Sequence, residues 1–465
     1  MPNPDSQPHL RRALGFWAAI AIVVGTTIGS GIFRVPSEMI RAVGSPGRVF
    51  VVWIFGGVLS LFGALTYAEL SAMMPEAGGE YVYLNAAYGP FFGFVYGWTQ
   101  TWVGKSASIA AMGTLFTTYL ADFFPALKEV VVVIPLPIGP DWKPLDIRWG
   151  QLAAIGVILF IAGGNYLGVR LGGDAQVALT ALKLALIGGL IAVGLFSTQA
   201  NTANLHSAVP ALPGGFAGFF KALVAALWAY DGWNNAGMLG SEIERPQKNL
   251  PRALIAGTLS IIGIYLAANL AYFAVLSGAE VAGSERVAAD MMRHVLGSRG
   301  AAAVSLAVMI SIFAALNGSI LSGSRVPFAM ARDGYFFQAA ARVHPRFRTP
   351  FVGIGILGVW SSLLLLSGHY DELFTMVIFP SWILYAMTAA SVIVLRRKLP
   401  AAERPFRVPG YPVVPLLFVL VAGMLLYSTL LSSPRESGIG LAVIVAGLPF
   451  YFSWKQRLRL SASTE

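Results

Sequence analysis

Long apolar segments alternate with short polar connections along the chain. A membrane-spanning helix needs about 20 mostly apolar residues, and twelve segments meet that requirement. These segments lie at 14–42, 47–74, 90–121, 149–168, 174–197, 216–243, 252–277, 300–331, 351–368, 371–395, 411–431 and 437–454. The pattern predicts an all-α polytopic membrane protein with twelve transmembrane helices embedded in the lipid bilayer.

The composition favours a membrane protein over other classes. Hydrophobic residues make up 56% of the 465 residues and charged residues 12%, about half of the roughly 25% typical of soluble domains. The net charge of +10 does not indicate nucleic-acid binding, because the basic residues are scattered in short clusters between apolar segments. Cysteine is absent and no histidine pair has metal-ligand spacing, so we expect no metal and no cofactor.

The basic residues of the connections predict an orientation. With both termini inside, 18 of the 32 Lys and Arg fall in inner segments, 10 in outer segments and four within spans. This excess follows the positive-inside rule. We therefore expect a multi-pass protein of the cell membrane (plasma or inner) with both termini in the cytoplasm.

Two spans carry glycine-rich, polar interruptions at matching positions. The first contains Gly-Thr-Thr-Ile-Gly-Ser-Gly at 25–31, and the sixth contains Tyr-Asp-Gly-Trp-Asn-Asn at 230–235. Because the two spans run in opposite directions, matched interruptions indicate an inverted-repeat transporter. A helix breaks inside a membrane only where protein or a water-filled cavity receives its backbone groups. The interruptions therefore predict a binding site at mid-membrane.

The two breaks together would complement an α-amino acid. A half-helix that starts near Ile32 would turn the positive end of its dipole toward a carboxylate. The half-helix that ends near 228–231 would turn free carbonyls toward an ammonium group. The alternative is that Gly25, Gly29 and Gly31 form a small-residue stripe for helix packing, which the second, matched break makes less favoured.

Four motifs occur in order along the chain. They are Thr-Ile-Gly-Ser-Gly-Ile-Phe at 27–33, Gly-Gly-Glu-Tyr at 78–81, Ala-Tyr-Asp-Gly-Trp-Asn at 229–234 and Lys-Asn-Leu-Pro-Arg-Ala at 248–253. With them the chain resembles the amino acid–polyamine–organocation superfamily, and most of all its L-type amino acid transporter branch. The resemblance implies a LeuT-like fold, a five-plus-five inverted repeat with helices 1 and 6 broken at mid-membrane and two C-terminal helices added.

The implied fold divides the chain into seven parts. These are an N-tail at 1–13, a first repeat at 14–197, an extracellular loop at 198–215, a second repeat at 216–395, a cytoplasmic loop at 396–410, helices 11 and 12 at 411–454, and a C-tail at 455–465. Heteromeric members of the branch carry an extracellular cysteine that tethers an ancillary glycoprotein. This chain has no cysteine, so we expect no disulfide-linked ancillary subunit.

The resemblance also implies roles for residues at the breaks. The carboxylate of a substrate would be held by Ile28, Gly29, Ser30 and Gly31, and its amine by the backbone around Trp228, Ala229 and Asp231. Trp228 stands where the family places an aromatic gate. Asp231 replaces a glycine that the family often has, and it would attract the amine, carry a proton or cap the broken helix.

Several other polar side chains lie inside the predicted spans. The family resemblance implies that the Lys183 ammonium replaces sodium or couples protons; the alternative is a structural lysine bonded to carbonyls. Lys105, Trp233, Asn234 and Asn317 are further candidates for the substrate pathway. Lys105 is more simply explained by a structural pairing, and Asn317 equally well by hydrogen bonds between helices. Glu242 is a candidate for an inner gate, and Arg325 for an inner ion pair.

These features predict a sodium-independent secondary transporter for neutral L-α-amino acids, working by alternating access through exchange or proton coupling. A cationic amino acid or polyamine transporter of the same fold is the alternative, because Asp231 lies at the amine end. A channel is the alternative class, but the chain has no filter sequence such as TVGYG. An enzyme is not expected, because the chain has no catalytic triad motif or metal cluster.

Overall fold

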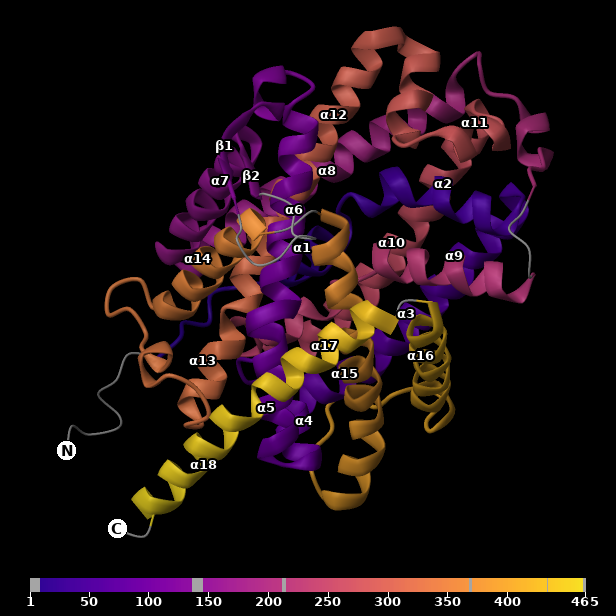
Figure 1. The fold of residues 1–465 in the computed structure, drawn as a ribbon. Coiled ribbons are helices and arrows are strands. Elements are labelled where there is room, and N and C mark those ends of the chain that lie inside the picture. The colour runs from indigo at the N-terminus through magenta and orange to yellow at the C-terminus, as the bar shows by residue number, and fades with distance from the viewer. Residues whose placement is uncertain (1–8, 136–144, 211–214, 368–369, 433, 463–465) are drawn as a thin grey trace.

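The computed structural model describes residues 9–135, 145–210, 215–367, 370–432 and 434–462, and helices make up most of this part of the chain (Figure 1). The long apolar segments are helical because a helix satisfies its own backbone groups, as a bilayer demands. The long helices are α3 (Pro46–Met73), α7 (Trp149–Tyr166), α8 (Val169–Phe196), α10 (Pro246–Val275), α12 (Val287–Gly323), α14 (Phe351–Ser367), α15 (Tyr370–Lys398) and α16 (Val413–Ser432).

Shorter helices flank or interrupt the long ones. They are α1 (Phe16–Thr27), α2 (Gly31–Val43), α4 (Glu80–Tyr88), α5 (Pro90–Thr99), α6 (Lys105–Leu120), α9 (Phe216–Ala229), α11 (Gly278–Gly283), α13 (Arg325–Arg332), α17 (Pro434–Ala446) and α18 (Leu448–Ala462). Single turns of tighter or wider helix lie between them: η2 (Gln100–Gly104), η3 (Pro125–Lys128), η4 (Thr202–His206), η5 (Trp233–Met238), η6 (Gly240–Glu242) and η7 (Gln338–Ala341).

The number of spans is only partly settled by helix length. Within the described residues, eight helices are long and apolar enough to cross a membrane, or nine when the bent pair α1 and α2 counts as one span. The other three predicted spans are helical but interrupted or shorter. A π-helical turn separates α5 from α6, α9 ends at the second break, and α14 has 17 residues. The count of twelve spans and the five-plus-five repeat stay predictions.

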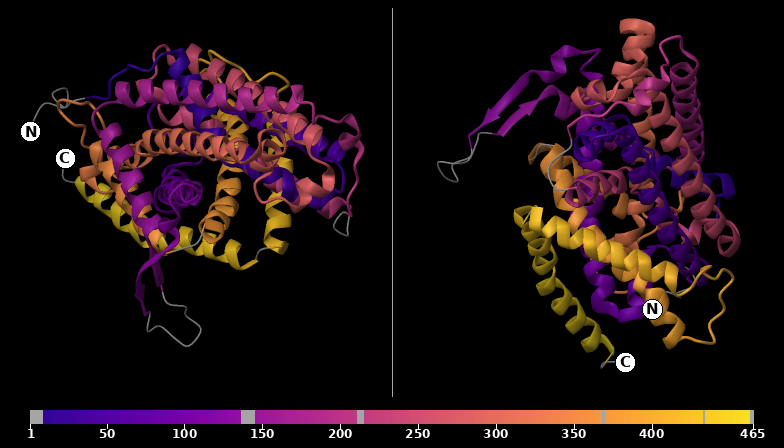
Figure 2. Two further views of the ribbon diagram at one scale, coloured as in Figure 1. Left: turned by 90° about the horizontal axis from the view of Figure 1, so that it is seen from above. Right: turned by 90° about the vertical axis from the view of Figure 1, so that its right-hand side faces the viewer.

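The expectation of an all-α chain is wrong at one segment. Strands β1 (Val130–Ile134) and β2 (Leu145–Arg148) pair antiparallel between α6 and α7, and they project sideways from the helices (Figure 2). A run of β-branched residues favours a strand, and β1 reads Val-Val-Val-Val-Ile. That signal is short, and it lies between two predicted spans.

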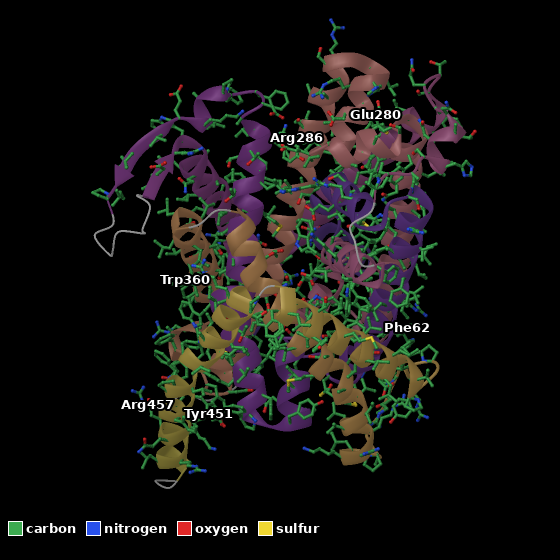
Figure 3. The ribbon with its side chains drawn as sticks, turned by 45° about the vertical axis from the view of Figure 1, so that its right-hand side comes forward. Phe62, Glu280, Arg286, Trp360, Tyr451 and Arg457 are labelled. Carbon is green, nitrogen blue, oxygen red and sulfur yellow. The ribbon has the colours of Figure 1, made fainter. Side chains whose placement is uncertain are left out.

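The two ends of the helix bundle carry different elements. Glu280 and Arg286 lie at one end, which we call the α11 end, and Tyr451 and Arg457 lie at the other, the α18 end (Figure 3). The bundle's middle is crossed by α1, which packs against α8, α10 and α12. Both breaks therefore lie inside the bundle, away from its lipid-facing surface.

Candidate functional site

The first break lies between α1 and α2. Helix α1 ends at Thr27, α2 begins at Gly31, and their axes differ in direction by 43°. Within the described residues, the N–H groups of Ser30, Gly31 and Ile32 donate no hydrogen bond. Unpaired N–H donors at a helix start, together with the helix dipole, are able to bind an anion.

The second break lies directly against the first. Helix α9 ends at Ala229, and Gly232 has a φ of 110°, which favours glycine. The hydroxyl of Thr26 donates to the carbonyl of Gly232 at 2.9 Å. A Cβ atom added to Gly31 would lie 2.8 Å from the Cβ of Ala229. The absence of a side chain at Gly31 thus lets the two broken helices touch.

Tyr265 of α10 joins both breaks. Its hydroxyl lies 2.6 Å from the carbonyl oxygen of Ala229 and 3.2 Å from that of Thr27. Because a carbonyl has two lone pairs, Ala229 keeps one that a substrate amine could use. Sequence reasoning missed this residue, since one tyrosine in an apolar span carries no signal that separates it from the others.

Lys183 reaches from α8 to the end of α1. Its side chain is fully buried, and its ammonium donates to the carbonyls of Gly25 at 2.7 Å and Ile28 at 2.6 Å. The Ser311 hydroxyl of α12 donates to the same Ile28 carbonyl at 2.9 Å. The positive charge stands where α1 ends and its carbonyls point outward, which is the favourable place for a cation.

Asp231 and Lys105 are two titratable residues beside the second break. The hydroxyl of Tyr385 donates to Asp231 Oδ1 at 2.8 Å. The opposite charges of Asp231 and Lys105 act on each other, and Lys105 also donates a hydrogen bond to the Asn235 side chain. The structure thus brings Lys105 close to the residues predicted to hold the amine.

Asn317 joins helices in the described structure. Its amide nitrogen donates to the Gly172 carbonyl at 3.1 Å and to Gln176 Oε1 at 2.8 Å, while its oxygen accepts from Asn165 at 2.9 Å. These bonds connect α12 with α7 and α8. Of the two roles considered for Asn317, the geometry favours the hydrogen-bond link between helices.

The two tryptophans near the second break differ in exposure. Trp228 is half-buried at the end of α9, and its ring lies 3.4 Å from the position of a Cβ on Gly31. Trp233 is buried and packs edge-on against Tyr67 at a centroid distance of 4.8 Å. The ring of Trp228 therefore borders the first break.

A buried ion pair joins α13 to η6, the turn that follows the second break. Arg325 Nε lies 2.7 Å from Glu242 Oε2, its Nη2 lies 2.8 Å from Oε1, and neither side chain is exposed. The Glu242 carbonyl also accepts from the backbone N–H groups of Ala13 and Leu14 at 3.0 Å. The two candidates for the inner side, Glu242 and Arg325, therefore contact each other.

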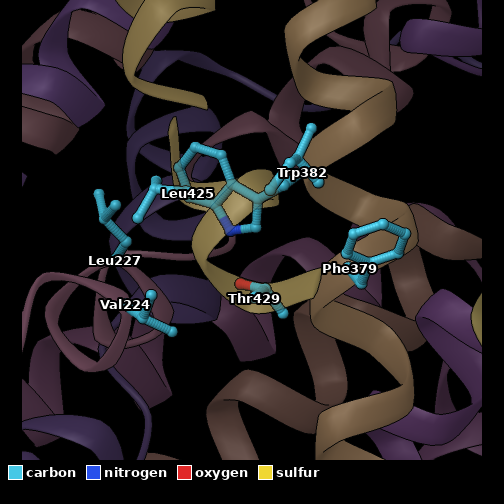
Figure 4. A pocket seen from close by; sticks show the side chains of 7 residues that line it. Val224, Leu227, Phe379, Trp382, Leu425 and Thr429 are labelled. Atoms are coloured by element: carbon cyan, nitrogen blue, oxygen red, sulfur yellow. The ribbon is translucent and has the colours of Figure 1, made fainter. Parts of the chain in front are cut away.

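An apolar recess borders α9 between α15 and α16 (Figure 4). It has an empty volume of about 220 Å³ and is lined by Val224, Leu227, Phe379, Trp382, Leu425, Leu426 and Thr429. Its lining carries no charged group, so it does not suit the charged ends of an amino acid.

Comparisons with known proteins place the chain in a family. The family model described as "Amino acid permease" matches residues 14–450. The "Serine/threonine exchanger SteT" of Bacillus subtilis is 33% identical over 454 residues, covering 96% of this chain and 98% of the relative. The human "b(0,+)-type amino acid transporter 1" is 31% identical, covering 97% and 90%. The human "Cystine/glutamate transporter" is 28% identical, covering 97% and 87%.

Proposed function

Because the chain belongs to the amino acid permease family, we propose that it carries neutral L-α-amino acids across the cell membrane by alternating access. The carboxylate of the substrate binds the free N–H groups of Ser30, Gly31 and Ile32 at the start of α2. Its amine binds carbonyls at the end of α9. The single observation that carries this proposal is the contact between the two broken helices, which places a donor end and an acceptor end side by side.

Sodium independence is part of the proposal. The Lys183 ammonium already occupies the carbonyls of Gly25 and Ile28. A sodium ion needs such oxygen ligands and would meet a fixed positive charge there. Transport is then driven by exchange or by protons.

Neutral substrates are favoured over cationic ones by the surroundings of Asp231. Its carboxylate accepts from Tyr385 and is offset by the charge of Lys105. A second ammonium, from a cationic side chain, would have to compete with Lys105. The runner-up function, transport of cationic amino acids or polyamines, requires Lys105 to move away.

The ion pair of Arg325 and Glu242 supports a site that is closed on its cytoplasmic side. In the proposed orientation the α18 end faces the cytoplasm, so the pair closes the cytoplasmic side. The site would then open to the cytoplasm when this pair separates. The absence of cysteine supports a transporter that acts without a disulfide-linked subunit.

Uptake into proteoliposomes tests the function. Radiolabelled serine, threonine, leucine and arginine are offered with and without unlabelled amino acid inside and with and without sodium. We expect uptake of neutral amino acids that is saturable and does not require sodium. If unlabelled amino acid inside the vesicles accelerates this uptake, the transporter works by exchange. Uptake of arginine alone would favour the runner-up, and unchanged uptake in Ser30→Trp would contradict the proposed site.

A further inference from the structure

Glu80 is a buried carboxyl group close to the α18 end, where α4 begins. It is 1% exposed, and the Tyr96 hydroxyl donates to its Oε2 at 2.9 Å. The Asn234 amide donates to its Oε1. No basic side chain among the described residues lies within ion-pair distance of it.

The charges around Glu80 do not balance. Asp231 and Glu80 both act on the Lys105 ammonium, so two carboxylates share one cation. A buried charge without a partner is costly, and such a group tends to neutralise by binding a proton. Burial raises the pKa of Glu80, and a backbone hydrogen bond, Lys105 and the bonds from Asn234 and Tyr96 oppose that rise.

Other groups that face this cluster do not change charge near neutral pH. The tyrosine hydroxyls there are neutral at pH 7, because the ordinary pKa of a tyrosine is about 10. The titratable groups around Glu80 are Tyr67, Tyr83, Tyr96, Lys105, Asp231 and Tyr385. A change of protonation in this cluster therefore concerns its carboxyl groups or Lys105.

Two buried polar atoms beside Glu80 lack partners. Within the described residues, Asn234 Oδ1 and Tyr83 Oη are buried and accept or donate no hydrogen bond. The Asn234 amide donates to an ionised Glu80; turned over, it would accept the proton of a neutral Glu80 through Oδ1. The same two side chains can thus satisfy both protonation states of the carboxyl group.

The cluster is connected to the second break. Asn234 and Asn235 are consecutive residues of η5, two and three positions after Gly232. Asn234 contacts Glu80, and Asn235 accepts from Lys105. A movement of η5 during the transport cycle would change the surroundings of Glu80 and Lys105 together.

We propose that Glu80 is a proton-binding site of the transport cycle, which takes a proton from water at the α18 end and exchanges it as η5 moves. This proposal rests on the proposed function and deepens it, because it names the proton as the coupled ion and Glu80 as its carrier. The Lys183 contact with α1 is a separate site and need not change its charge.

Calorimetry of substrate binding in two buffers tests the proposal directly. The purified full chain is titrated with its best amino acid in buffers whose heats of ionisation differ. The wild type is expected to exchange protons with the buffer on binding, and Glu80→Gln, which stays neutral and keeps hydrogen-bonding atoms, is expected to bind with no proton exchange. Uptake into proteoliposomes should change severalfold between pH 6 and pH 8 in the wild type and stay level in Glu80→Gln.

One further variant serves as a control and another as a second test. Glu76→Gln makes the same chemical change four residues earlier, at an exposed position, and should keep the wild-type proton exchange. Tyr96→Phe removes one donor to the carboxylate, so the midpoint of the pH dependence should move upward; this variant decides the matter if Glu80→Gln does not fold. Amino acid binding without proton exchange in the wild type, or unchanged exchange in Glu80→Gln, would overturn the proposal. Absence of amino acid binding would instead contradict the proposed function.

Discussion

Arg325 and Glu242 form two parallel hydrogen bonds, of 2.7 and 2.8 Å, in a place without any exposure to solvent. Their residues belong to α13 and to the turn that follows the second break. Bidentate pairing of this kind fixes orientation as well as distance. The pair therefore holds the segment after the second break against α13 in one register.

Loss of one member of this pair should be costly. Glu242→Gln leaves the Arg325 charge buried without its partner, which typically destabilises by about 3–5 kcal/mol. Unfolding by denaturant in detergent measures the loss. The double variant Glu242→Leu with Arg325→Met should recover much of it, because no charge is then buried; a double variant as unstable as the single one would contradict this explanation.

The same pair can be tested as a gate. The chain has no cysteine, so Ala13→Cys provides a single thiol beside the Glu242 carbonyl. Breaking the pair with Glu242→Gln should increase the rate at which a water-soluble maleimide modifies this thiol. Equal rates with and without Glu242→Gln would show that the pair does not control access.

Two glycines of the first break should respond differently to alanine. A Cβ on Gly31 would meet the Cα of Ala229 at 2.9 Å, whereas a Cβ on Gly29 would meet no atom within 4 Å. We expect Gly31→Ala to lower thermal stability and to abolish binding, because it separates the broken helices. Gly29→Ala should keep the stability and weaken substrate binding only. Thermal unfolding with and without substrate distinguishes the two outcomes.

Lys183 should be needed for transport. Lys183→Met removes the ammonium from both carbonyls; Ile28 keeps the Ser311 hydroxyl as a donor, whereas Gly25 loses its side-chain donor. A buried group without a partner costs about 1–3 kcal/mol. If the end of α1 loses that much stabilising free energy, we expect uptake to decrease about tenfold or more. Lys221→Met removes an exposed lysine and serves as the matched control, with uptake expected near the wild-type value.

The hydroxyl of Tyr265 offers a test with a control on the same helix. Tyr265→Phe removes the hydrogen-bond donor to the Ala229 carbonyl, and we expect a loss of about 1–3 kcal/mol in stability. Tyr272 is also buried in α10, but its hydroxyl has no partner within the described residues. Tyr272→Phe should therefore be neutral or stabilising. Equal effects of the two changes would refute a specific role for Tyr265.

The α11 end should be sensitive to acid. Hydrogen bonds from the Ser277 hydroxyl and backbone hold the pKa of Glu280 below its usual value. A carboxyl group whose pKa is lowered by folding stabilises the fold at every pH above its unfolded-state pKa. This stabilisation disappears as the pH falls through the folded-state pKa. The difference in thermal midpoint between the wild type and Glu280→Gln should therefore be present at neutral pH and vanish in acid.

Local sequence patterns predicted where the chain is interrupted. The glycine-rich segment at 25–31 predicts a break, and in the structure α1 ends at Thr27 and α2 begins at Gly31. The polar segment at 230–235 predicts a second break, and α9 ends at Ala229. The depth of Lys183 in its span also predicts a buried ammonium. The carbonyls that it contacts fit a purely structural lysine as well as a lysine that replaces sodium. Its role in coupling stays a prediction.

Contacts between distant segments could not be predicted in the same way. Tyr265, Ser311 and Glu80 reach the breaks or their neighbours from other helices, and nothing in their local sequence says which way they face. The pairing of Glu242 with Arg325 likewise joins residues 83 positions apart. The second half of span 6 also differs from a regular helix, because the polar residues after Gly232 form 3₁₀ turns held by side-chain contacts.

The hydrogen bond from Thr26 to Gly232 joins residues separated by 206 positions. A chain that enters the membrane from its N-terminus therefore inserts its first broken helix long before the segment that satisfies it has been synthesised. Until then the freed backbone groups of the first break face either lipid, which cannot pair with them, or a protein of the insertion machinery. Biogenesis of this protein thus depends on keeping an unfinished site sheltered while a further 206 of the 465 residues are made.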